Sequence, residues 1–565
     1  MHCPGVPVPP GIRFHDETGE IIHLFRQAKK ERSRENDESE NDKYPELVLR
    51  AIGEDENFTS LCFFCHNYMM SNRGIQSSRG LFEHLIPYFQ LTDSDSLLSV
   101  ATAALAATML AMWRGLDPDS LLSKKYNARA ILLMKETIGA SPENESDIVL
   151  ISIIALQFRE ALIAHKKMRP VDGSHQKGAY AVITHRTAKG FRSLASKKLL
   201  QEVRNTMVTE AIRTHQPVHI DPDVWEDDDP QPPSPSSDLD KVAIDLANLQ
   251  ALYERYKSTL EAGFANGQKV LTAKDLSIIA SFRRAATTLD QRLQIWAGSQ
   301  QSYFAPCRMA ADEIAESIRK AGLYGDFCNV YPSVQLAGVW HTYNCYRLIL
   351  LKMSLYADQT VQDLPRENDV LFDESRAWRT AAEKTLQHCV DEICAAVPFH
   401  LGNRMGTGSI HDFSNAHKFE FPWPAPKNDP YGCPIHPAAQ QYVRAHNVIP
   451  LSSEERTRQS LAMGGYNILG HMAFVLGMAG ESLDLTGTRN DAPKIGSFLR
   501  RGQIPWLVGQ WQRALKLHRT RIVDGGGKRP SAMEKSAPST KKAQTNELEK
   551  EVTEVKKAMK YSFGV

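Results

Sequence analysis

Apolar residues recur at helical spacing, three and four positions apart, along two long stretches of the chain, residues 44–215 and 241–520. Neither stretch holds a sustained alternation of apolar and polar residues, which is the pattern of a half-buried strand. Between Ile148 and Ile163 nearly every face of the expected helix is apolar, so other helices must surround it. The pattern therefore predicts an all-α fold of packed antiparallel helices.

Polar segments separate and flank these helical stretches. Residues 1–43 include the run RQAKKERSRENDESENDK, which mixes both charge signs and has almost no apolar residue. Residues 216–240 hold five prolines between Pro222 and Pro235, with acidic residues and serines among them. Residues 521–565 are rich in lysine and otherwise polar. Because such compositions cannot bury enough surface to fold, we expect a charged linker, a second linker or long loop, and a disordered tail.

Short polar signals mark the expected helix boundaries. Asp117-Pro118 has the residue types preferred at an N-cap and at the first helical position, so it predicts a helix that begins there. Ser452 followed by Glu455 fits a capping box, in which each residue satisfies a backbone amide of the other. Pro398 cannot donate a backbone hydrogen bond, and we expect the helix that precedes it to stop before it.

Composition bounds the compartment and the partners. Nine cysteines in 565 residues are sparse and odd in number, which argues against a disulfide framework and favours a reducing compartment. The 67 Lys and Arg nearly balance the 66 Asp and Glu, so any contact with DNA must come from a local segment. The most apolar run, Leu97 to Trp113, is short for a membrane span and rich in Ala and Thr, so we expect a buried core helix. With no signal peptide visible, we expect a soluble, intracellular protein.

Motifs for catalysis or metal binding are weak. The glycines of GNRMGTGS lack both the Gly-x-Gly-x-x-Gly spacing and a preceding strand. Cys62-x-x-Cys65-His66 offers one pair of zinc ligands without a second pair, so we expect buried thiols on a helix. The carboxylates of residues 227–229 lie among prolines, whereas a magnesium site on one helix face needs a rigid helix. We therefore expect no enzymatic activity and no cofactor.

Motifs in order from Phe58 to Arg213 resemble the regulatory domain of fungal zinc-cluster (Zn2Cys6) transcription factors. FFCHNYMMSNRGIQSSRGLFEHLIPYF resembles the entry helix pair of that domain, and LLSVATAALAATMLAMWRG resembles its Ala-rich core helix. YNARAILLMKETIG resembles a further helix, and GQIPWLVGQWQRALK resembles the closing helix of these proteins. The resemblance implies a multi-helix regulatory domain whose first half is 44–215 and whose second half is 241–520.

The most specific match is HQKGAYAVITHRTAKGF, followed by LLQEVRNTMV. Thr187 stands where the family carries glycine, which loosens the match. We expect the histidine and the Gly-Ala pair to let two helices pack closely rather than to bind a ligand. The residues that carry the family motif are His175, Gly178, Ala179, Ile183 and Arg186, with Arg204 in the following helix.

The first residues resemble the junction that follows the zinc cluster in this family. There the last zinc-binding cysteine is followed by Pro-Gly and then by a Phe-Arg/His-Asp-Glu-Thr linker, and this chain carries CPG and IRFHDET. The resemblance thus places Cys3 as the last ligand of a two-zinc, six-cysteine cluster. One thiolate cannot hold zinc, since such small clusters fold only around their metal. We therefore expect Cys3 to be a remnant ligand, with zinc bound only if further cysteines lie upstream.

The resemblance implies a transcription regulator that acts through its helical domain. It implies a nuclear location, shared in some states with the cytoplasm, and partners from the transcription machinery, with DNA bound only by a full-length form. Lys528-Arg529 with Lys541-Lys542 could serve as a nuclear import signal or be a solvated tail. Two alternatives stay open: a helical scaffold protein derived from such a regulator, and a helical enzyme. The motifs specify neither a small-molecule effector nor the oligomeric state.

Overall fold

The protein is described here by a computed structural model, in which the described residues from Glu56 onward belong to one unit. Residues 1–55, with Cys3 and the charged linker, lie outside the described residues, as do 219–233 and the tail from 519. Apart from isolated positions, the structure describes residues 56–69, 93–140, 146–167, 173–186, 193–218, 234–267, 270–362, 369–423, 451–486 and 491–518.

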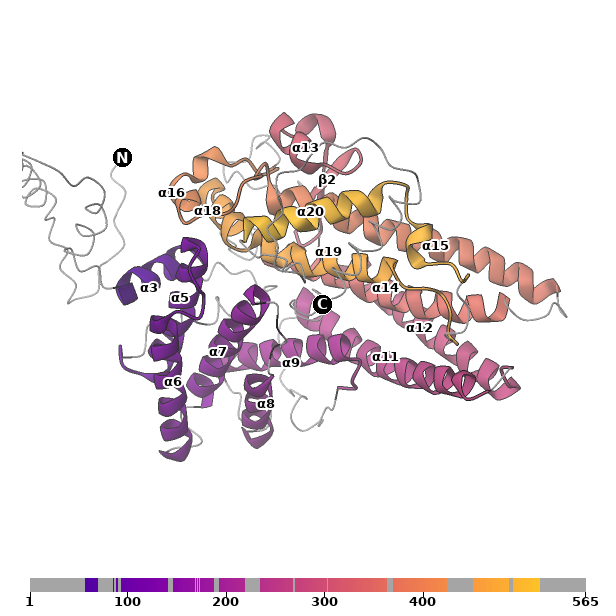
Figure 1. Cartoon of the computed structure of the whole chain (residues 1–565), viewed down its shortest axis with the longest axis horizontal. Helices are drawn as coiled ribbons and strands as arrows, with labels where there is room; N and C mark the ends of the chain where they lie inside the picture. Colours follow the sequence, from indigo (N-terminus) through magenta and orange to yellow (C-terminus); the bar gives the residue numbers. More distant parts are fainter. Residues whose placement is uncertain are drawn as a thin grey trace, which may run out of the picture. The chain divides into compact units, whose positions relative to one another are not determined.

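The first part of this unit is a cluster of helices around α5 (Figure 1). α5 is buried along nearly its whole length and packs against α3, α6 and α7. Its small Ala, Ser and Thr side chains allow neighbours on every side, which an amphipathic helix could not accommodate. α7 also packs against α8 and α9. The helices are α3 (Glu56–Asn67), α5 (Leu97–Arg114), α6 (Leu121–Ala140), α7 (Ser146–Lys166), α8 (Ser174–Arg186) and α9 (Leu194–Thr214).

Longer helices form the second part. α14 lies among α11, α12, α15 and α19, and α20 packs on α19 and α15. The predicted all-α class is confirmed, since packed helices build both parts. The long helices are α11 (Pro235–Ala265), α12 (Ala273–Ser299), α14 (Val334–Gln362), α15 (Asp369–Leu401), α19 (Gly465–Ala479) and α20 (Gln503–Leu517). The short ones are α13 (Glu316–Gly322), α16 (His411–Ser414), α18 (Ser453–Gln459), η2 (Ala311–Glu313), η3 (Ala416–Lys418), η4 (Ser460–Gly464) and η5 (Ile495–Phe498).

A small antiparallel sheet interrupts the helices of the second part. Strand β1 (Cys307–Ala310) pairs with β2 (Phe327–Val330), with Cys307 opposite Val330. β2 packs on α15, and residues of both strands join a small apolar cluster with Tyr331 and Phe399. Strands of four residues are too short for their alternation to stand out in the sequence.

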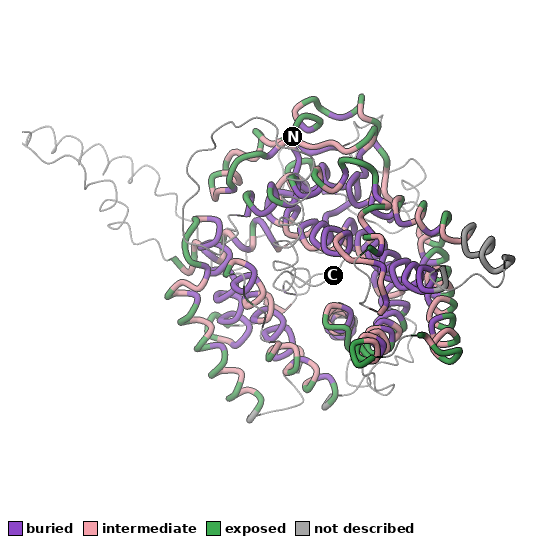
Figure 2. Tube along the Cα trace, turned by 45° about the vertical axis from the view of Figure 1, so that its right-hand side comes forward, coloured by how far each residue is buried: buried purple, intermediate pink, exposed green. Residues whose placement is uncertain are grey.

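The two predicted halves share their interior. Val208, Ala211 and Ile212 of α9 belong to the large core of the second part, and Ala462 of η4 belongs to the core of the first. Figure 2 shows buried residues along the inner sides of the helices in both parts, with exposed residues on their outer sides. The halves are therefore built around continuous packing rather than as two separate bodies.

Several helix boundaries differ from those expected. α6 begins at Leu121, because Ser120 accepts the amide of Ser123 at 3.3 Å, while Asp117 accepts the amide of Asp119 in the preceding turn. The Asp-Pro pair therefore belongs to that turn, and the N-cap is the serine. The capping box, in contrast, is confirmed: it opens α18, where Ser452 and Glu455 satisfy each other's backbone amides.

Prolines begin or continue helices where breaks were expected. α15 runs through Pro398 to Leu401, so the predicted stop was wrong. Pro398 still accepts from the amide of Gly402 through its carbonyl, at 2.8 Å, which closes the last turn. Pro235 is the first residue of α11, with Ser234 as N-cap, so the expected 216–240 linker ends before residue 234.

Three helices within the described residues are long and apolar enough to cross a membrane by length and composition. Their apolar windows are 94%, 72% and 72% buried inside the protein, in Leu97–Arg114, Asp147–Lys166 and Ser453–Ala479. The first of these is the run that the sequence predicts as a core helix, and this burial confirms that prediction.

Candidate functional site

The family-motif residues lie on α8 and α9. Ala179 is buried, and His175 lies on the same helix with its Nε2 atom 3.8 Å from Glu160 Oε2 of α7. α8 does pack on α7, but a Cβ atom added to Gly178 would meet only Ile153 Cδ1, at 3.9 Å. That is an ordinary van der Waals distance, so this helix contact does not depend on the absence of a side chain at Gly178.

The two arginines of the motif lie on different helices. Arg186 ends α8, and its side chain lies outside the described residues. Arg204 is half-buried in the middle of α9. α8 and α9 are joined by a hydrogen bond in which Gln176 Nε2 donates to the carbonyl of Thr206 at 3.2 Å. The motif thus spans a helix pair at the edge of the first part.

The Cys-x-x-Cys-His pattern lies on α3. Cys62 is exposed and Cys65 half-buried, so the expectation of buried thiols is met only in part. Burial, together with the neighbouring Cys62, raises the pKa of the Cys65 thiol. His66 faces Arg458 of α18, with Nε2 2.5 Å from the guanidinium. Among the described residues, no group of three or more His, Cys, Asp or Glu side chains could hold a metal ion.

The buried cysteines are unsuited to nucleophilic chemistry. Cys389 and Cys394 are completely buried in α15, and burial raises the pKa of each thiol to about 12. Burial likewise raises the pKa of Cys328 and Cys345. Because the thiolate is the reactive form, these four side chains act as small apolar core residues at neutral pH.

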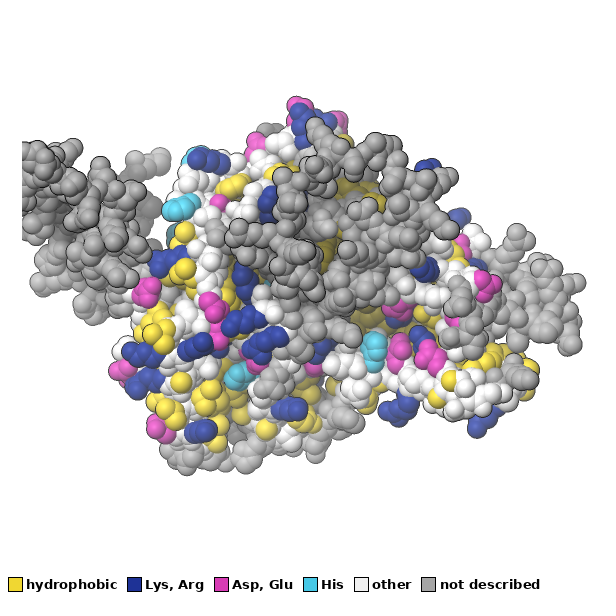
Figure 3. Space-filling view, viewed as in Figure 1, with side chains coloured by type: hydrophobic (Ala, Val, Ile, Leu, Met, Phe, Trp, Pro, Cys, Tyr) yellow, Lys and Arg dark blue, Asp and Glu magenta, His cyan; other side chains and the backbone are white. Residues whose placement is uncertain are grey.

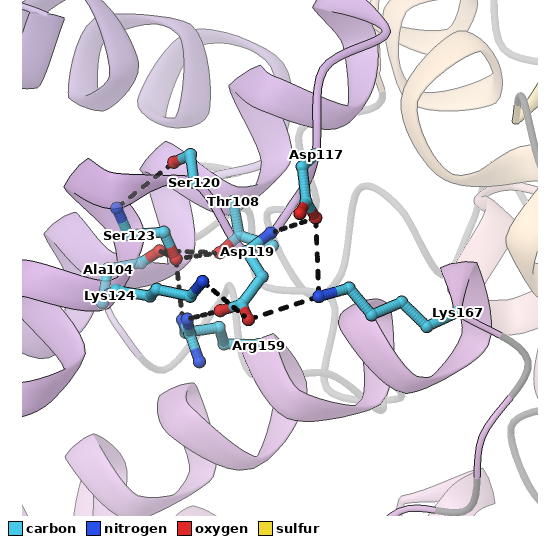
Figure 4. A network of polar contacts seen from close by, with 9 residues as sticks. All are labelled: Ala104, Thr108, Asp117, Asp119, Ser120, Ser123, Lys124, Arg159 and Lys167. Carbon is cyan, nitrogen blue, oxygen red and sulfur yellow. Dashed lines mark hydrogen bonds and ion pairs between the residues drawn. The ribbon is translucent and has the colours of Figure 1, made fainter.

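A network of charged and hydroxyl groups ties the turn before α6 to α7 (Figure 4). Arg159 of α7 donates from its guanidinium to Asp119 Oδ1 at 2.9 Å and from Nε to Ser123 Oγ at 2.8 Å. Ser123 in turn lies 2.6 Å from the hydroxyl of Thr108 of α5. Lys167, the residue that follows α7, donates from Nζ to Asp119 Oδ2 at a distance of 3.3 Å. One carboxylate and one guanidinium therefore fix three helices in register.

The charges of this network compensate one another. Burial raises the pKa of Asp119, but the hydrogen bond and charge of Lys167, with Arg159 and Lys124, lower it by more. Burial lowers the pKa of Arg159, which its pairing with Asp119 opposes. A carboxylate with three cationic neighbours is satisfied, so the network is a structural clasp rather than a reactive site.

A second polar centre lies where the two parts meet, and we call it the junction: Tyr68, Trp113, Arg404, Tyr466 and His518. It is built around η4, a π-helical turn between α18 and α19. A π turn leaves carbonyls without their usual partners in the helix. Here Tyr68 donates to the carbonyl of Ala462 at 3.4 Å and Arg404 to that of Leu461 at 3.4 Å. Trp113 Nε1 donates to the Tyr68 hydroxyl at 2.6 Å.

Arg404 is the charged centre of the junction and is 2% exposed. Its guanidinium donates to Asp412 Oδ2 at 3.2 Å and lies 5.6 Å from the centre of the Phe419 ring. Burial lowers its pKa, and Asp412 opposes that shift. Arg513 of α20 donates to the Arg404 carbonyl at 2.7 Å and to the Gly402 carbonyl at 2.5 Å, so α20 is fixed to the end of α15.

His518 closes the junction from the end of α20. Its ring centre lies 3.7 Å from that of Tyr466 and 5.8 Å from that of Trp113. Neither ring nitrogen has a hydrogen-bond partner among the described residues, and burial, with Arg404 next, holds the pKa of His518 well below its usual value. A Cβ atom on Gly465 would lie 2.1 Å from His518 Nε2, so glycine is required there for the ring to fit.

The glycine run that the sequence singles out serves this junction. A Cβ atom on Gly408 would lie 1.9 Å from the carbonyl oxygen of Leu517 and 3.0 Å from Trp113 Cζ3. Gly402 adopts a φ of 57°, in the left-handed region, immediately after α15. These glycines allow the chain to turn and to approach α20 closely, which is a packing role and not a nucleotide loop.

Three buried histidines lie beside the junction, on α14, α15 and α19. His341 Nε2 and His400 Nε2 are 2.8 Å apart, and the His471 ring centre is 5.2 Å from that of His341. Burial, with His471 next, lowers the pKa of His400 to about 3, and burial and the other two rings hold that of His341 well below normal. The pair is therefore neutral, with one ring donating and the other accepting.

One small cavity lies at the surface between β2, α15 and the start of α20, with a volume of about 200 Å³. Its carboxylates, Asp391 and Glu392, are both paired. Asp391 Oδ2 lies 2.8 Å from the Arg500 guanidinium, and Glu392 pairs with Arg308. Because its charges are paired internally, the cavity offers little free charge to a ligand.

The sequence patterns did not predict the junction, and they gave only one indication of the network around Asp119 and Arg159. One signal was present: Arg159 is the single cation near the middle of the largely apolar helix α7, and a cation that is buried there needs a partner. Arg404 and His518 lie in loops or at helix ends, where polar residues are ordinary. Their burial follows from tertiary contacts, such as those of Arg404 with the Leu461 carbonyl and of His518 with the Trp113 ring, which local patterns do not encode.

Comparison of the chain with protein-family models, with curated proteins and with solved structures finds no match.

Proposed function

We propose that this protein is a transcription regulator of the fungal zinc-cluster family that acts through its helical domain. The observation that carries the proposal is the ordered series of motifs from Phe58 to Arg213, together with CPG and IRFHDET near Cys3. The all-α fold agrees with what the resemblance implies. A domain whose parts share one interior can also transmit a contact made on one part to the other.

The cysteines of the described part of this domain are dispersed over several elements. A two-zinc cluster requires six thiolates around two metal ions. The described cysteines lie on α3, β1, β2, α14 and α15, and no three potential ligands come together among the described residues. The role proposed for the helical domain therefore rests on protein contacts.

A helical scaffold without a role in transcription is the second candidate. The all-α fold does not distinguish the two, because either kind of protein can be built from packed helices. The distinction lies in whether the chain alters transcription when it is brought to a promoter.

A tethering experiment tests the proposal. The chain is fused to an unrelated DNA-binding module and a reporter with the matching site is measured in a fungal host. A regulator is expected to raise or lower reporter output relative to the module alone, and a tagged form is expected in the nucleus. An unrelated helical protein of similar size, fused in the same way, is the control. A fusion that is expressed, nuclear and without effect on the reporter would favour the scaffold.

A further inference from the structure

The outer face of α6 combines exposed leucines with a strong excess of positive charge. Leu121 is 85% exposed, Leu132 60% and Ile138 50%, so this one helix carries several of the exposed large apolar side chains among the described residues. The same helix carries four basic residues and one acidic residue. Figure 3 shows hydrophobic and basic side chains next to one another in the region of α6.

The apolar and basic residues are interleaved on a single stripe. At about 100° per residue, Leu121, Lys125, Ala128, Leu132 and Lys135 fall within an arc of roughly 80°. All five are exposed. From Leu121 to Leu132 the stripe extends about 16 Å along the helix axis, which is about three turns. A stripe of this width and length can be covered by one helix and does not require a broad partner surface.

Part of the positive charge on this face is free to meet a partner. Lys124 Nζ lies 3.5 Å from Asp119, and Arg129 lies 3.9 Å from Asp95. Lys125 and Lys135 have no ion-pair partner among the described residues. An unpaired ammonium beside an exposed leucine favours a ligand that offers carboxylates and apolar side chains together.

We propose that this face of α6 is a docking site for an acidic amphipathic helix of another protein. The partner's apolar side chains would cover Leu121 and Leu132 while its carboxylates pair with Lys125 and Lys135. The inference goes beyond the proposed role in transcription and stands on the exposed face alone.

Other occupants fit the face less well. A second copy of this chain would bring four basic residues against four more, and like charges across an interface are unfavourable. A lipid surface prefers apolar and basic residues on separate faces, whereas here insertion of the leucines would bury the ammonium groups. Nucleic acid would pair with the lysines but would gain nothing from the leucines.

Fluorescence anisotropy tests the site with a labelled synthetic helical peptide in which leucines recur every three or four residues among glutamates. The intact chain is expected to bind it, and added salt is expected to weaken binding because ion pairs contribute. A peptide of the same composition in scrambled order, which has no apolar stripe, is expected to bind at least about tenfold more weakly, a change of about 1.4 kcal/mol.

Three variants locate the contact. Leu121→Gln/Leu132→Gln and Lys125→Glu/Lys135→Glu are each expected to weaken peptide binding by at least about tenfold. The matched control is Leu252→Gln/Ile295→Gln, which alters two exposed apolar residues on α11 and α12 and is expected to leave binding unchanged. Circular dichroism and thermal melting of each variant separate loss of binding from loss of folding.

Several outcomes would overturn the proposal. They are equal binding of the ordered and scrambled peptides, loss of binding in the α11/α12 control alone, and a folded Leu121→Gln/Leu132→Gln variant that binds normally. Tighter binding to a DNA duplex of random sequence, or to vesicles that contain phosphatidylserine, would assign the face to those classes instead. None of these results depends on the reporter, so the docking site and the proposed function can fail separately.

Discussion

Arg159 and Lys167 both pair with the Asp119 carboxylate, but Arg159 is buried and Lys167 is partly exposed. The Arg159 side chain is 8% exposed and bonds to Asp119 and Ser123, whereas Lys167 is 38% exposed and contacts the opposite oxygen of Asp119. Removing Arg159 takes away its hydrogen bonds to Ser123 and to Asp119 Oδ1 at a buried position, where water replaces a lost partner less well than at the surface. Removing Lys167 exposes its partner to water, which replaces the ammonium at little cost.

We therefore expect Arg159→Met to lower the free energy of unfolding by about 2 kcal/mol. Lys167→Met is expected to lower it by less than about 1 kcal/mol. Urea denaturation followed by circular dichroism measures both. Equal losses for the two variants would show that burial does not set the strength of the clasp.

The side chains of the candidate sites were only partly predictable. Arg159 could be suspected because it interrupts an apolar helix, but its partner Asp119 lies in a turn 40 residues earlier. The glycines near residue 408 were conspicuous, yet their role depends on the carbonyl of Leu517 and the ring of Trp113. The glycines indicated that the backbone is constrained near residue 408, and only the tertiary contacts show which groups require the absence of a side chain there.

At the scale of elements, the capping box of α18 is a local device whose effect can be isolated. Ser452 Oγ accepts the amide of Glu455 at 3.2 Å, and the Glu455 carboxylate accepts the amide of Ser452 at 2.8 Å. Ser453 is the first helical residue and is also exposed. Ser452→Ala is expected to cost about 1 kcal/mol of stability.

Ser453→Ala is the matched control, because it removes a hydroxyl one position later without removing the cap. Alanine is the better helix former, so this variant is expected to be neutral or slightly stabilising. Thermal melting of both variants supplies the comparison. A loss at Ser453→Ala as large as that at Ser452→Ala would contradict the capping role.

Elements whose formation depends on local sequence were predicted, and elements whose formation depends on tertiary packing were missed. The capping box and the core helix α5 were read from sequence because hydrogen bonding within one turn and continuous apolarity define them. Pro398 was expected to end its helix, but a buried environment keeps α15 helical for three more residues. β1 and β2 were missed because four-residue strands depend on each other and on α15 for stability.

At the scale of the whole molecule, the described parts of the two helical stretches belong to one compact unit. The sequence predicts these stretches as two halves of one helical domain. The apolar residues of α9 lie in the core of the second part and Ala462 lies in the core of the first, so each part supplies core residues to the other. Sequence periodicity identifies which face of a helix is buried, but not which other helix covers it.

The buried histidines make the stability of this interior depend on pH. His341 and His400 are fully buried, and His165 and His518 nearly so. Burial is the first cause of a lowered pKa at all four, to about 4 for His165 and about 3 for His400. The unfolded chain therefore binds more protons than the folded one below pH about 6.5, the ordinary value for histidine. Their contribution to stability is present above that pH and is lost as the pH falls toward the folded values.

The His341–His400 pair allows a direct test of this linkage. Between pH 6 and 5, each buried neutral histidine steepens the loss of stability by up to about 1.4 kcal/mol per pH unit. A His341→Leu/His400→Leu variant removes both rings together with their mutual hydrogen bond, so neither ring is left facing the other's empty place. We expect its free energy of unfolding, measured by urea denaturation at each pH, to fall less steeply by up to about 2.7 kcal/mol per pH unit.

The exposed His417→Leu controls for the loss of a histidine as such. If the double variant and the parent lose stability with the same slope over this range, the buried pair is not the source of the acid sensitivity. His165 and His518, whose pKa values burial also lowers, then become the groups to replace next.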